Sequence, residues 1–292
     1  MDKVVKDSLD FSSFERTYKL LANVGSGGCG TVMLAQDRTF GTKVAIKKIP
    51  KKAALDVMQI RNEVSAMRAF SHPNLCQLHG VYESMDHVML VMEYLQGGSL
   101  TDYIKANSRF DEKKAHMLFS QIVSAVAHMH EVGFSHRDLK SDNVMLDSQG
   151  NAKIIDFGLC ANEITGYESD GKCHGSRAYM PPEFISTTTD NGEDRRCADT
   201  WSLGCIFFQM LTGEHPFWKP GSTQLQTTKQ ILNAEFTIPW HVSPGAREIL
   251  KGLLNKSVKN RMTCKEVMEH SWLVNKAEVL DVSLNLECDE WW

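Results

Sequence analysis

The first residues whose spacing suggests chemistry are the glycines of the run Gly-Ser-Gly-Gly-Cys-Gly at 25–30, which fits the pattern G-x-G-x-x-G. Taken alone the pattern is weak, because it also occurs in dinucleotide-binding units and in ordinary glycine-rich turns. A dinucleotide site needs an acidic residue near the end of the next strand, and here that strand ends in Lys47 and Lys48. The run fits better as a hairpin whose small residues let backbone N–H groups lie over a polyphosphate.

A lysine and a glutamate downstream could form an ion pair that reaches such a phosphate. Lys47 ends the strand-like run Val-Ala-Ile-Lys, where a lysine is usually a solvated surface residue. Glu63 lies three residues after Ile60 and four before Met67, on or beside the apolar face of a predicted helix. A carboxylate at that position needs a cationic partner, and Lys47 is the nearest candidate in the predicted layout. A Lys47–Glu63 pair below the hairpin would direct the ammonium toward a phosphate.

Strand-like patterns dominate the part of the chain that must position these groups. One helix interrupts them at 53–70, where apolar residues recur at three- and four-residue steps, and the run Ser-His-Pro-Asn at 71–74 ends it. Two β-rich runs joined through glycines indicate a hairpin. The expected strands are 18–24, 31–35, 43–49, 77–82 and 87–94.

Helices dominate after Gly97 and Gly98, which break the chain and mark a hinge between two parts. The run 201–211 is apolar nearly all round, which predicts a buried central helix. The other expected helices are 112–132, 246–256 and 263–274.

Composition excludes several classes of protein. The 292 residues are 42% hydrophobic and 23% charged, which is ordinary for a globular chain and unlike a disordered one. A net charge of −4 favours neither a phosphate-coating nucleic-acid binder nor an anionic membrane surface. Eight cysteines without a Cys-x-x-Cys pair are typical of a reduced, intracellular protein without a structural zinc site. The first seven residues alternate charge, which argues against a secretory signal.

Two further motifs resemble those of a known enzyme family. The run His-Arg-Asp-Leu-Lys-Ser-Asp-Asn at 136–143 and Asp-Phe-Gly at 156–158 are similar to the catalytic loop and metal-binding motif of eukaryotic protein kinases. Met-Pro-Pro-Glu at 180–183 stands where that family has Ala-Pro-Glu, and the resemblance covers about residues 18–275. It implies an α+β, bilobal fold with a small antiparallel sheet lobe containing one key helix and a larger, mainly helical lobe. The implied divisions are an N-terminal extension at 1–17, an N-lobe at 18–94, a C-lobe at 95–275 and a tail at 276–292.

The resemblance also implies roles for the residues of the catalytic loop. Asp138 would orient the substrate hydroxyl and accept its proton, and Lys140 would contact the transferred phosphoryl group. Asn143 and Asp156 would hold Mg²⁺ ions that bridge the phosphates of ATP. The implied activity is that of a transferase, a protein kinase that uses ATP and Mg²⁺.

In the N-lobe the resemblance assigns Lys47, locked by Glu63, to the α- and β-phosphates. The backbone from Glu93 to Leu95 would supply hinge hydrogen bonds, with Met92 as a bulky gatekeeper. Ordinary core packing also explains part of the apolar wall around adenine, because such walls extend the core. The implied nucleotide-binding residues are Val24, Gly25, Ser26, Gly27, Gly28, Cys29, Gly30, Val32, Ala45, Lys47, Met92, Glu93, Leu95 and Met145.

Three supporting contacts are expected by the same resemblance. Glu183 would pair with Arg261, and Asp199 would brace the catalytic loop. Lys140 and Ser176 resemble the serine/threonine type, with Ser176 near Asp138 and Lys140. The residues implied for peptide binding are Asp142, as one carboxylate toward a basic residue of the substrate, and Gln209, which stands where relatives that prefer basic peptides often place an acid.

The sequence leaves some alternatives open. The hinge and catalytic loop look like the STE group, whereas the closing His-Ser-Trp-Leu at 270–273 looks like the calcium/calmodulin-dependent group. A catalytically silent kinase-fold scaffold is disfavoured because all four key catalytic residues are present, and a small-molecule kinase is disfavoured by the peptide-binding segment before Glu183. We expect protein substrates, no nucleic-acid or membrane partner, and a cytoplasmic location, with the nucleus and the oligomeric state left open.

Activation is expected to depart from the common pattern. The position three residues before the glycine of the Gly-Ser pair is Lys172, which cannot carry a phosphate on a hydroxyl, and the usual supporting basic residue is replaced by Ala161. Arg137 would be left available, and Glu168 and Asp170 could pair with it unmodified. The hypothesis is that basal activity needs no phosphate at the usual site, although three loop hydroxyls could still modulate it: Thr165, Tyr167 and Ser169.

Overall fold

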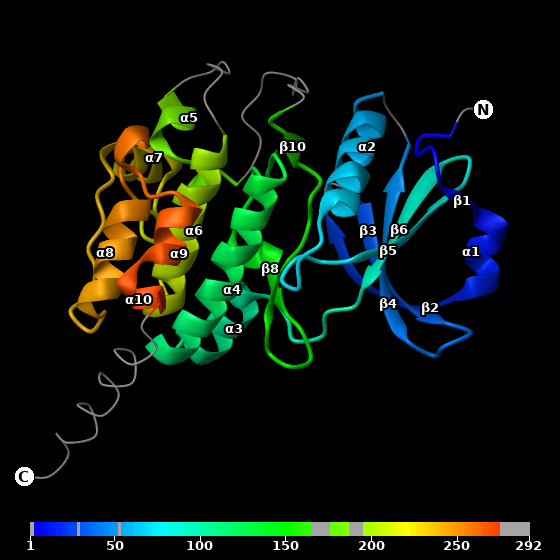
Figure 1. The fold of residues 1–292 in the computed structure, drawn as a ribbon, viewed down its shortest axis with the longest axis horizontal. Helices are drawn as coiled ribbons and strands as arrows, with labels where there is room; N and C mark the ends of the chain where they lie inside the picture. Colours follow the sequence, from blue (N-terminus) through cyan, green and yellow to red (C-terminus); the bar gives the residue numbers. More distant parts are fainter. Residues whose placement is uncertain (1–2, 28–29, 52–53, 165–175, 187–194, 275–292) are drawn as a thin grey trace, which may run out of the picture.

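The computed structural model describes residues 3–27, 30–51, 54–164, 176–186 and 195–274. These residues form a sheet-containing part, at the right of Figure 1, and a mainly helical part at its left. The expected bilobal α+β fold is confirmed. No helix among the described residues has the length and apolar character needed to cross a membrane.

The sheet-containing part is built on one six-stranded sheet in the order β1-β5-β6-β4-β3-β2. The strand pairs from β5 to β2 are antiparallel, as expected. The sequence patterns did not predict β1, which pairs parallel with β5. The strands are β1 (Leu9–Asp10), β2 (Tyr18–Gly27), β3 (Gly30–Asp37), β4 (Lys43–Pro50), β5 (Leu78–Glu83) and β6 (His87–Glu93).

Both faces of this sheet are covered, by different elements. Side chains alternate along β6, so Val88 and Leu90 pack in the cluster that includes Ile60 and Val64 of α2 (Ala54–Ala69), whereas Met89 packs on the other face. On that other face the buried Phe14 of α1 (Phe11–Thr17) completes a second cluster. Each face thus has its own small core.

The helical part packs around one large core, and a smaller second cluster contains Trp201 and Phe217. The helix α6 (Arg196–Thr212) is buried on nearly all sides, which confirms the predicted central helix, although it begins five residues before Trp201. Its Phe207 stacks on Phe119 of α4 (Glu112–Glu131) with ring centroids 4.0 Å apart. The remaining helices are α3 (Leu100–Asn107), α5 (Pro182–Ser186), α7 (Gln224–Asn233), α8 (Pro244–Leu253), α9 (Cys264–Glu269) and α10 (Ser271–Val274).

Short strands and 3₁₀ turns connect the helices of the helical part. Among the described residues they are β7 (Phe134–Ser135), β8 (Val144–Leu146), β9 (Ala152–Ile154), β10 (Ala161–Asn162) and the 3₁₀ turns η1 (Ser141–Asn143), η2 (Arg177–Tyr179) and η3 (Val258–Asn260). β8 pairs with β9, and β10 pairs with β7.

The predicted helix at 263–274 is wrong as a single helix. His270 is extended, with ψ of 137°, so α9 ends there and α10 starts at the next residue. The helices α1, α3, α5 and α7 were also absent from the prediction. Two of them carry a capping box, in which Ser99 with Asp102 starts α3 and Thr223 with Gln226 starts α7.

Among the described residues, four cysteines carry free thiols inside the fold. Cys76, Cys160, Cys205 and Cys264 are buried, and burial raises the pKa of each of these thiols. Cys76 lies where the two parts meet, because its backbone N–H donates to the carbonyl of Ile154 at 2.9 Å.

Candidate active site

The described glycines of the run lie on two paired strands, because Gly27 at the end of β2 pairs with Gly30 at the start of β3. Gly30 has φ of +135°, and a Cβ there would lie 2.4 Å from the carbonyl oxygen of Lys48. Only glycine therefore lets the start of β3 lie directly on β4. Two of the implied nucleotide-binding residues, Gly28 and Cys29, lie outside the described residues.

Lys47 stands on β4 and joins two carboxylates from distant parts of the chain. Its Nζ lies 2.6 Å from Oε1 of Glu63 on α2 and 2.7 Å from Oδ1 of Asp156. Lys47 and Glu63 are 7% and 3% exposed, so the predicted pair is present and buried. Burial opposes charging of Lys47, but Glu63 and Asp156 outweigh it and raise the lysine's pKa. Burial raises the pKa of the Glu63 carboxyl, and the ammonium opposes that shift.

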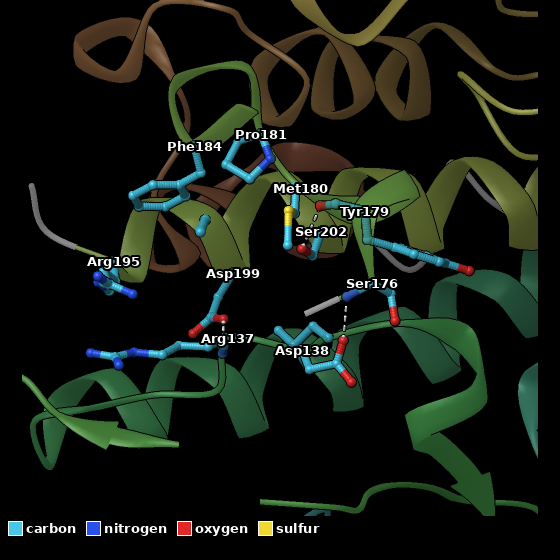
Figure 2. A pocket seen from close by; sticks show the side chains of 12 residues that line it. Arg137, Asp138, Ser176, Tyr179, Met180, Pro181, Phe184, Arg195, Asp199 and Ser202 are labelled. Atoms are coloured by element: carbon cyan, nitrogen blue, oxygen red, sulfur yellow. Dashed lines mark hydrogen bonds between the residues drawn. The ribbon is translucent and has the colours of Figure 1, made fainter. Parts of the chain in front are cut away.

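The catalytic-loop residues gather around the Asp138 carboxylate. Its Oδ1 accepts the backbone N–H of Ser176 at 2.8 Å, and its Oδ2 accepts from Nζ of Lys140 at 2.7 Å. The same Nζ donates to Oγ of Ser176 at 2.9 Å, so the expected grouping of these three residues is present. Figure 2 shows Asp138 directed toward the Ser176 backbone in a pocket whose opposite wall includes Pro181 and Phe184.

Asp199, at the start of α6, holds this loop through its main chain. Its carboxylate accepts the backbone N–H groups of His136 at 2.8 Å and Arg137 at 2.9 Å, and Nε2 of His130 lies 2.9 Å from it. Burial alone would raise the pKa of Asp199, but the hydrogen bond and charge of His130, with His136, lower it. The loop adopts a left-handed conformation at Arg137, with φ of +68°. The expected brace is present, as Figure 2 shows for the Arg137 bond.

The two residues implied as metal ligands lie side by side. The backbone N–H of Ile155 donates to the carbonyl of Asn143 at 2.9 Å, which places Asp156 next to that loop. Nδ2 of Asn143 donates to the backbone carbonyl of Asp138 at 2.9 Å, so the amide oxygen is the atom left for a metal. Despite burial, the ammonium of Lys47 lowers the pKa of Asp156 and keeps it anionic.

These oxygens fit Mg²⁺, which is bound by one or two protein oxygen ligands together with phosphates and water. Among the described residues no three histidine, cysteine, aspartate or glutamate side chains form a metal-binding group. Two such oxygen ligands leave the other positions of the ion to phosphates and water, so Asn143 and Asp156 fit Mg²⁺ bound together with a polyphosphate.

The apolar residues implied for adenine come from three places. Ala45 on β4 pairs with Met92 on β6, and Val32 on β3 pairs with Lys47. Met145 on β8 forms a bridge to Ser99 just beyond the hinge. The structure therefore brings the sheet residues and Met145 to the boundary of the two parts. The wall residue Val24 is 48% exposed, whereas Leu95, implied for its backbone, has a buried side chain.

Arg137 is not left available, which corrects the expectation from the sequence. Its Nη2 lies 3.1 Å from Oε1 of Glu163, and its Nε donates to Oγ of Ser135 at 3.2 Å. Ser135 Oγ also donates to Glu163. The pairing of β10 with β7 places Glu163 beside the loop. The sequence did not predict this contact, because strands of two residues show no recognisable pattern. Glu168, Asp170 and Lys172 lie outside the described residues.

A groove beside the catalytic loop contains the residues expected to face a peptide. Asp142 lines it, and sequence reasoning missed Glu214, which adds a second carboxylate. Gln209 also lines it, but its Oε1 accepts from the hydroxyl of Tyr179 at 2.7 Å. Trp218, 46% exposed, forms part of the wall.

The predicted Glu183–Arg261 pair is present and bidentate. Nη1 and Nη2 of Arg261 lie 2.6 and 2.9 Å from the two oxygens of Glu183. The Arg261 side chain is 1% exposed and its guanidinium lies 5.1 Å from the ring centroid of Trp201. The segment after Ser176 is therefore fixed to the core of the helical part.

Comparison with known proteins gives a consistent family. A family model described as "Protein kinase domain" matches residues 18–273. The chain is 37% identical over 267 residues to the maternal embryonic leucine zipper kinase of Xenopus tropicalis, covering 91% of this chain and 40% of that protein. It is 38% identical over 261 residues to CBL-interacting protein kinase 33 of Oryza sativa subsp. japonica, covering 87% and 56%.

A third relative is sperm motility kinase 3A of Mus musculus, 35% identical over 270 residues, with 92% of this chain and 52% of that protein covered. The chain thus spans about half the length of the curated relatives that it matches.

Proposed function

The chain belongs to the protein kinase family, and from that premise we propose that it transfers the γ-phosphoryl group of ATP to serine or threonine hydroxyls of protein substrates. The observation that carries the proposal is the arrangement of Asp138, Lys140 and Ser176 next to Asn143 and Asp156. Phosphoryl transfer depends mainly on position and on charge neutralisation, and this arrangement supplies both.

Asp138 acts on the acceptor. Its carboxylate orients the substrate hydroxyl and takes the proton as the oxygen attacks the γ-phosphorus, while the bond from that phosphorus to the β-phosphate oxygen breaks and ADP leaves. The Ser176 N–H and Lys140 Nζ bonds hold the carboxylate in place. Lys140 lies next to the same carboxylate, so its ammonium neutralises charge on the phosphoryl group during transfer.

Lys47 and the metal-ligand pair act on the nucleotide. Asn143 and Asp156 would hold Mg²⁺, which would supply positive charge against the negative charge of the ATP phosphates. Lys47 is held between Glu63 and Asp156, which keeps it charged and aimed at the same region. The glycine hairpin brings backbone N–H groups of β2 and β3 to the boundary where the phosphates would lie.

The variant Asp138→Asn tests the proposal. It should lower kcat by at least roughly 10²-fold, the usual effect of losing an acid–base group, with binding of ATP nearly unchanged. The control is Asp86→Asn, a substitution at an exposed turn residue, and this variant should keep full activity. A serine/threonine peptide array and radiolabelled ATP measure transfer, and chelation of Mg²⁺ should abolish it. Full activity of Asp138→Asn, activity in EDTA, or exclusive labelling of tyrosine would contradict the proposal.

We also propose that basal activity requires no phosphate on the residues that follow Glu163. Phosphate on a neighbouring loop acts by giving an arginine an anionic partner, and Arg137 already has the Glu163 carboxylate. Enzyme treated with phosphatase and verified by mass should keep most of its activity. The Glu163→Gln variant, treated in the same way, should lose severalfold more of its activity than the wild type does. Near-complete loss in treated wild type, traced to one loop hydroxyl, would show the proposal to be wrong.

A further inference from the structure

The segment before α1, residues 3–8, is tied to one buried carboxylate at the edge of the sheet. Glu83 accepts the backbone N–H of Val4 at 2.8 Å, the N–H of Val5 at 3.3 Å and the hydroxyl of Ser8 at 2.8 Å. Lys51 Nζ lies 2.6 Å from the same carboxylate, whose side chain is 7% exposed. Burial would raise the pKa of Glu83, but these bonds lower it and keep the anchor charged.

The same segment contacts α2 through both side chain and main chain. Val5 is 5% exposed and belongs to the cluster that contains Ile60 and Val64. Arg61 Nε donates to the carbonyl of Val4 at 2.8 Å. The segment therefore joins the sheet edge at Glu83 to one face of α2, as the parallel strand β1 continues the connection along β5.

This face of α2 adjoins the one that carries the catalytic contact. Glu63 lies between Arg61 and Val64 in the sequence, and its carboxylate points to Lys47. The second half of the helix is also fixed by Met67 in the core of the helical part. The middle turn, with Ile60 and Val64, rests on the small cluster that Val5 completes.

We propose that residues 3–8 are a positioning element for the phosphoryl-transfer reaction, with Val5 and the Val4 carbonyl setting the place of α2 and thereby of Glu63 against Lys47. The inference rests on the proposed kinase activity. It goes beyond that activity by assigning a role to a segment outside residues 18–273, which match the kinase domain. Ordinary packing would predict instead that loss of Val5 lowers stability alone.

The experiment uses the full chain with Val5→Ala, Arg61→Ala and the conservative Val5→Ile. A catalytic group displaced by about 1 Å can cost up to about 10²-fold. We therefore expect roughly tenfold loss of kcat/KM for Mg·ATP in the two alanine variants. The Val5→Ile variant should keep the kcat/KM of the wild type, because isoleucine still fills the cluster. The matched control is Phe14→Leu, which lies in the same extension but packs on the sheet face away from α2. It should lower the melting temperature and leave kcat/KM unchanged.

A double-mutant cycle separates positioning from packing. In a Glu63→Gln background, Val5→Ala should cause no further loss of kcat/KM, because the contact through which it acts is already gone. Equal losses in both backgrounds, no loss in either, or the same loss in Phe14→Leu would overturn the proposal. Arg61→Ala, at the helix surface, carries the same test if Val5→Ala does not fold.

Hydrogen exchange gives a readout that needs no activity. Amides of α2 should exchange faster in Val5→Ala than in Phe14→Leu at matched stability, and equal exchange would count against positioning. If the wild type transfers no phosphate, the proposed kinase activity fails. The exchange of α2 still decides whether the segment sets the position of this helix.

Discussion

The two parts of the molecule hold their charged functional groups in different ways. In the helical part, Asp199 fixes the catalytic loop by accepting main-chain N–H groups, and it is 1% exposed near the start of the buried helix α6. In the sheet part, Lys47 and Glu63 hold each other by side chains, and Glu63 stands on a single helix over a small cluster. The catalytic loop is thus held through its main-chain N–H groups, and the lysine through a side-chain ion pair whose glutamate depends on the packing of α2.

This difference indicates which half of the site can be adjusted. A main-chain hydrogen bond survives most side-chain changes nearby, because the backbone follows the fold. The position of Glu63 depends on what packs against α2, including Val5. We therefore expect regulation to act on the sheet part, by changing the position of Glu63 relative to Lys47. We expect substitutions in the helical part to act mainly by destabilising the fold.

The largest expected effect comes from removing the cation that the sheet part relies on. Lys47→Met should reduce kcat/KM at least as strongly as a lost acid–base group, by roughly 10²-fold or more, because the phosphates lose their contact. Loss of one partner of a buried pair costs about 3–5 kcal/mol of stability, yet the chain should remain folded. Activity assays and denaturant unfolding measure the two effects separately.

The pH dependence of the same variant identifies the origin of its instability. Without Lys47 the folded-state pKa of Glu63 rises further above its unfolded value, so stability is present at low pH and lost as pH rises toward the folded pKa. The stability deficit relative to wild type should therefore be smaller at pH 5 than at pH 8. The control, Lys47→Met with Glu63→Gln, should show no increase of its deficit from pH 5 to pH 8, because it lacks the titrating carboxyl; a pH-independent deficit in the single variant would contradict this account.

Asp199→Asn tests the helical part. Hydrogen bonds to charged groups contribute about 1.5–3 kcal/mol each, and the amide keeps one acceptor, so we expect a loss of about 2–4 kcal/mol. The lowered pKa of Asp199 means that its contribution is full above the unfolded value and is lost as pH falls through the folded value. Between pH 6 and pH 3, the free energy of unfolding measured with urea should change less in the variant than in wild type. Unchanged stability at pH 7 would show that the main-chain brace is not what holds the loop.

The smallest effect concerns a buried histidine of the helical part that gains nothing from charge. His215 is buried, its Nδ1 accepts from Phe217 N–H at 3.2 Å, and its Nε2 has no partner among the described residues. Burial lowers the pKa of His215 to about 4. Wild-type stability should fall by up to roughly 3 kcal/mol as pH falls from 6.5 to 4, because the unfolded chain binds the proton first.

The variant His215→Asn keeps an acceptor for Phe217 and removes the titration. Its stability should vary less between pH 7 and pH 5 than that of wild type or of His79→Asn, a change at an exposed histidine. Equal pH dependence in all three proteins would refute the assignment.

The contacts that the sequence predicted correctly involve residues fixed by motifs. Lys47 with Glu63, Glu183 with Arg261, and Asp138 with Ser176 each combine opposite charges or donors at positions that the kinase motifs identify. The strands β2 to β6 and the helices α2 and α4 were also predictable, since each is long enough to show a pattern, and α6 was predictable from its long apolar run.

The contacts that the sequence did not predict depend on short elements. Glu163 reaches Arg137 because two strands of two residues pair, and Glu83 becomes an anchor because β1 is a two-residue parallel strand. A period cannot be seen in two residues, and a parallel partner distant in sequence leaves no local pattern. The split of 263–274 at His270 is equally local, a single residue in an extended conformation.

The buried thiols distinguish opening at the boundary of the two parts from opening of the helical part. A thiol alkylates only as thiolate and only where reagent can reach it, so Cys205 and Cys264 stay inert while the helical core is closed, and Cys76 stays inert while the two parts remain in contact. Alkylation followed by peptide mass mapping therefore measures a separate labelling rate for each cysteine. If the backbone-fixed half is the more rigid one, Cys76 should be labelled before Cys205.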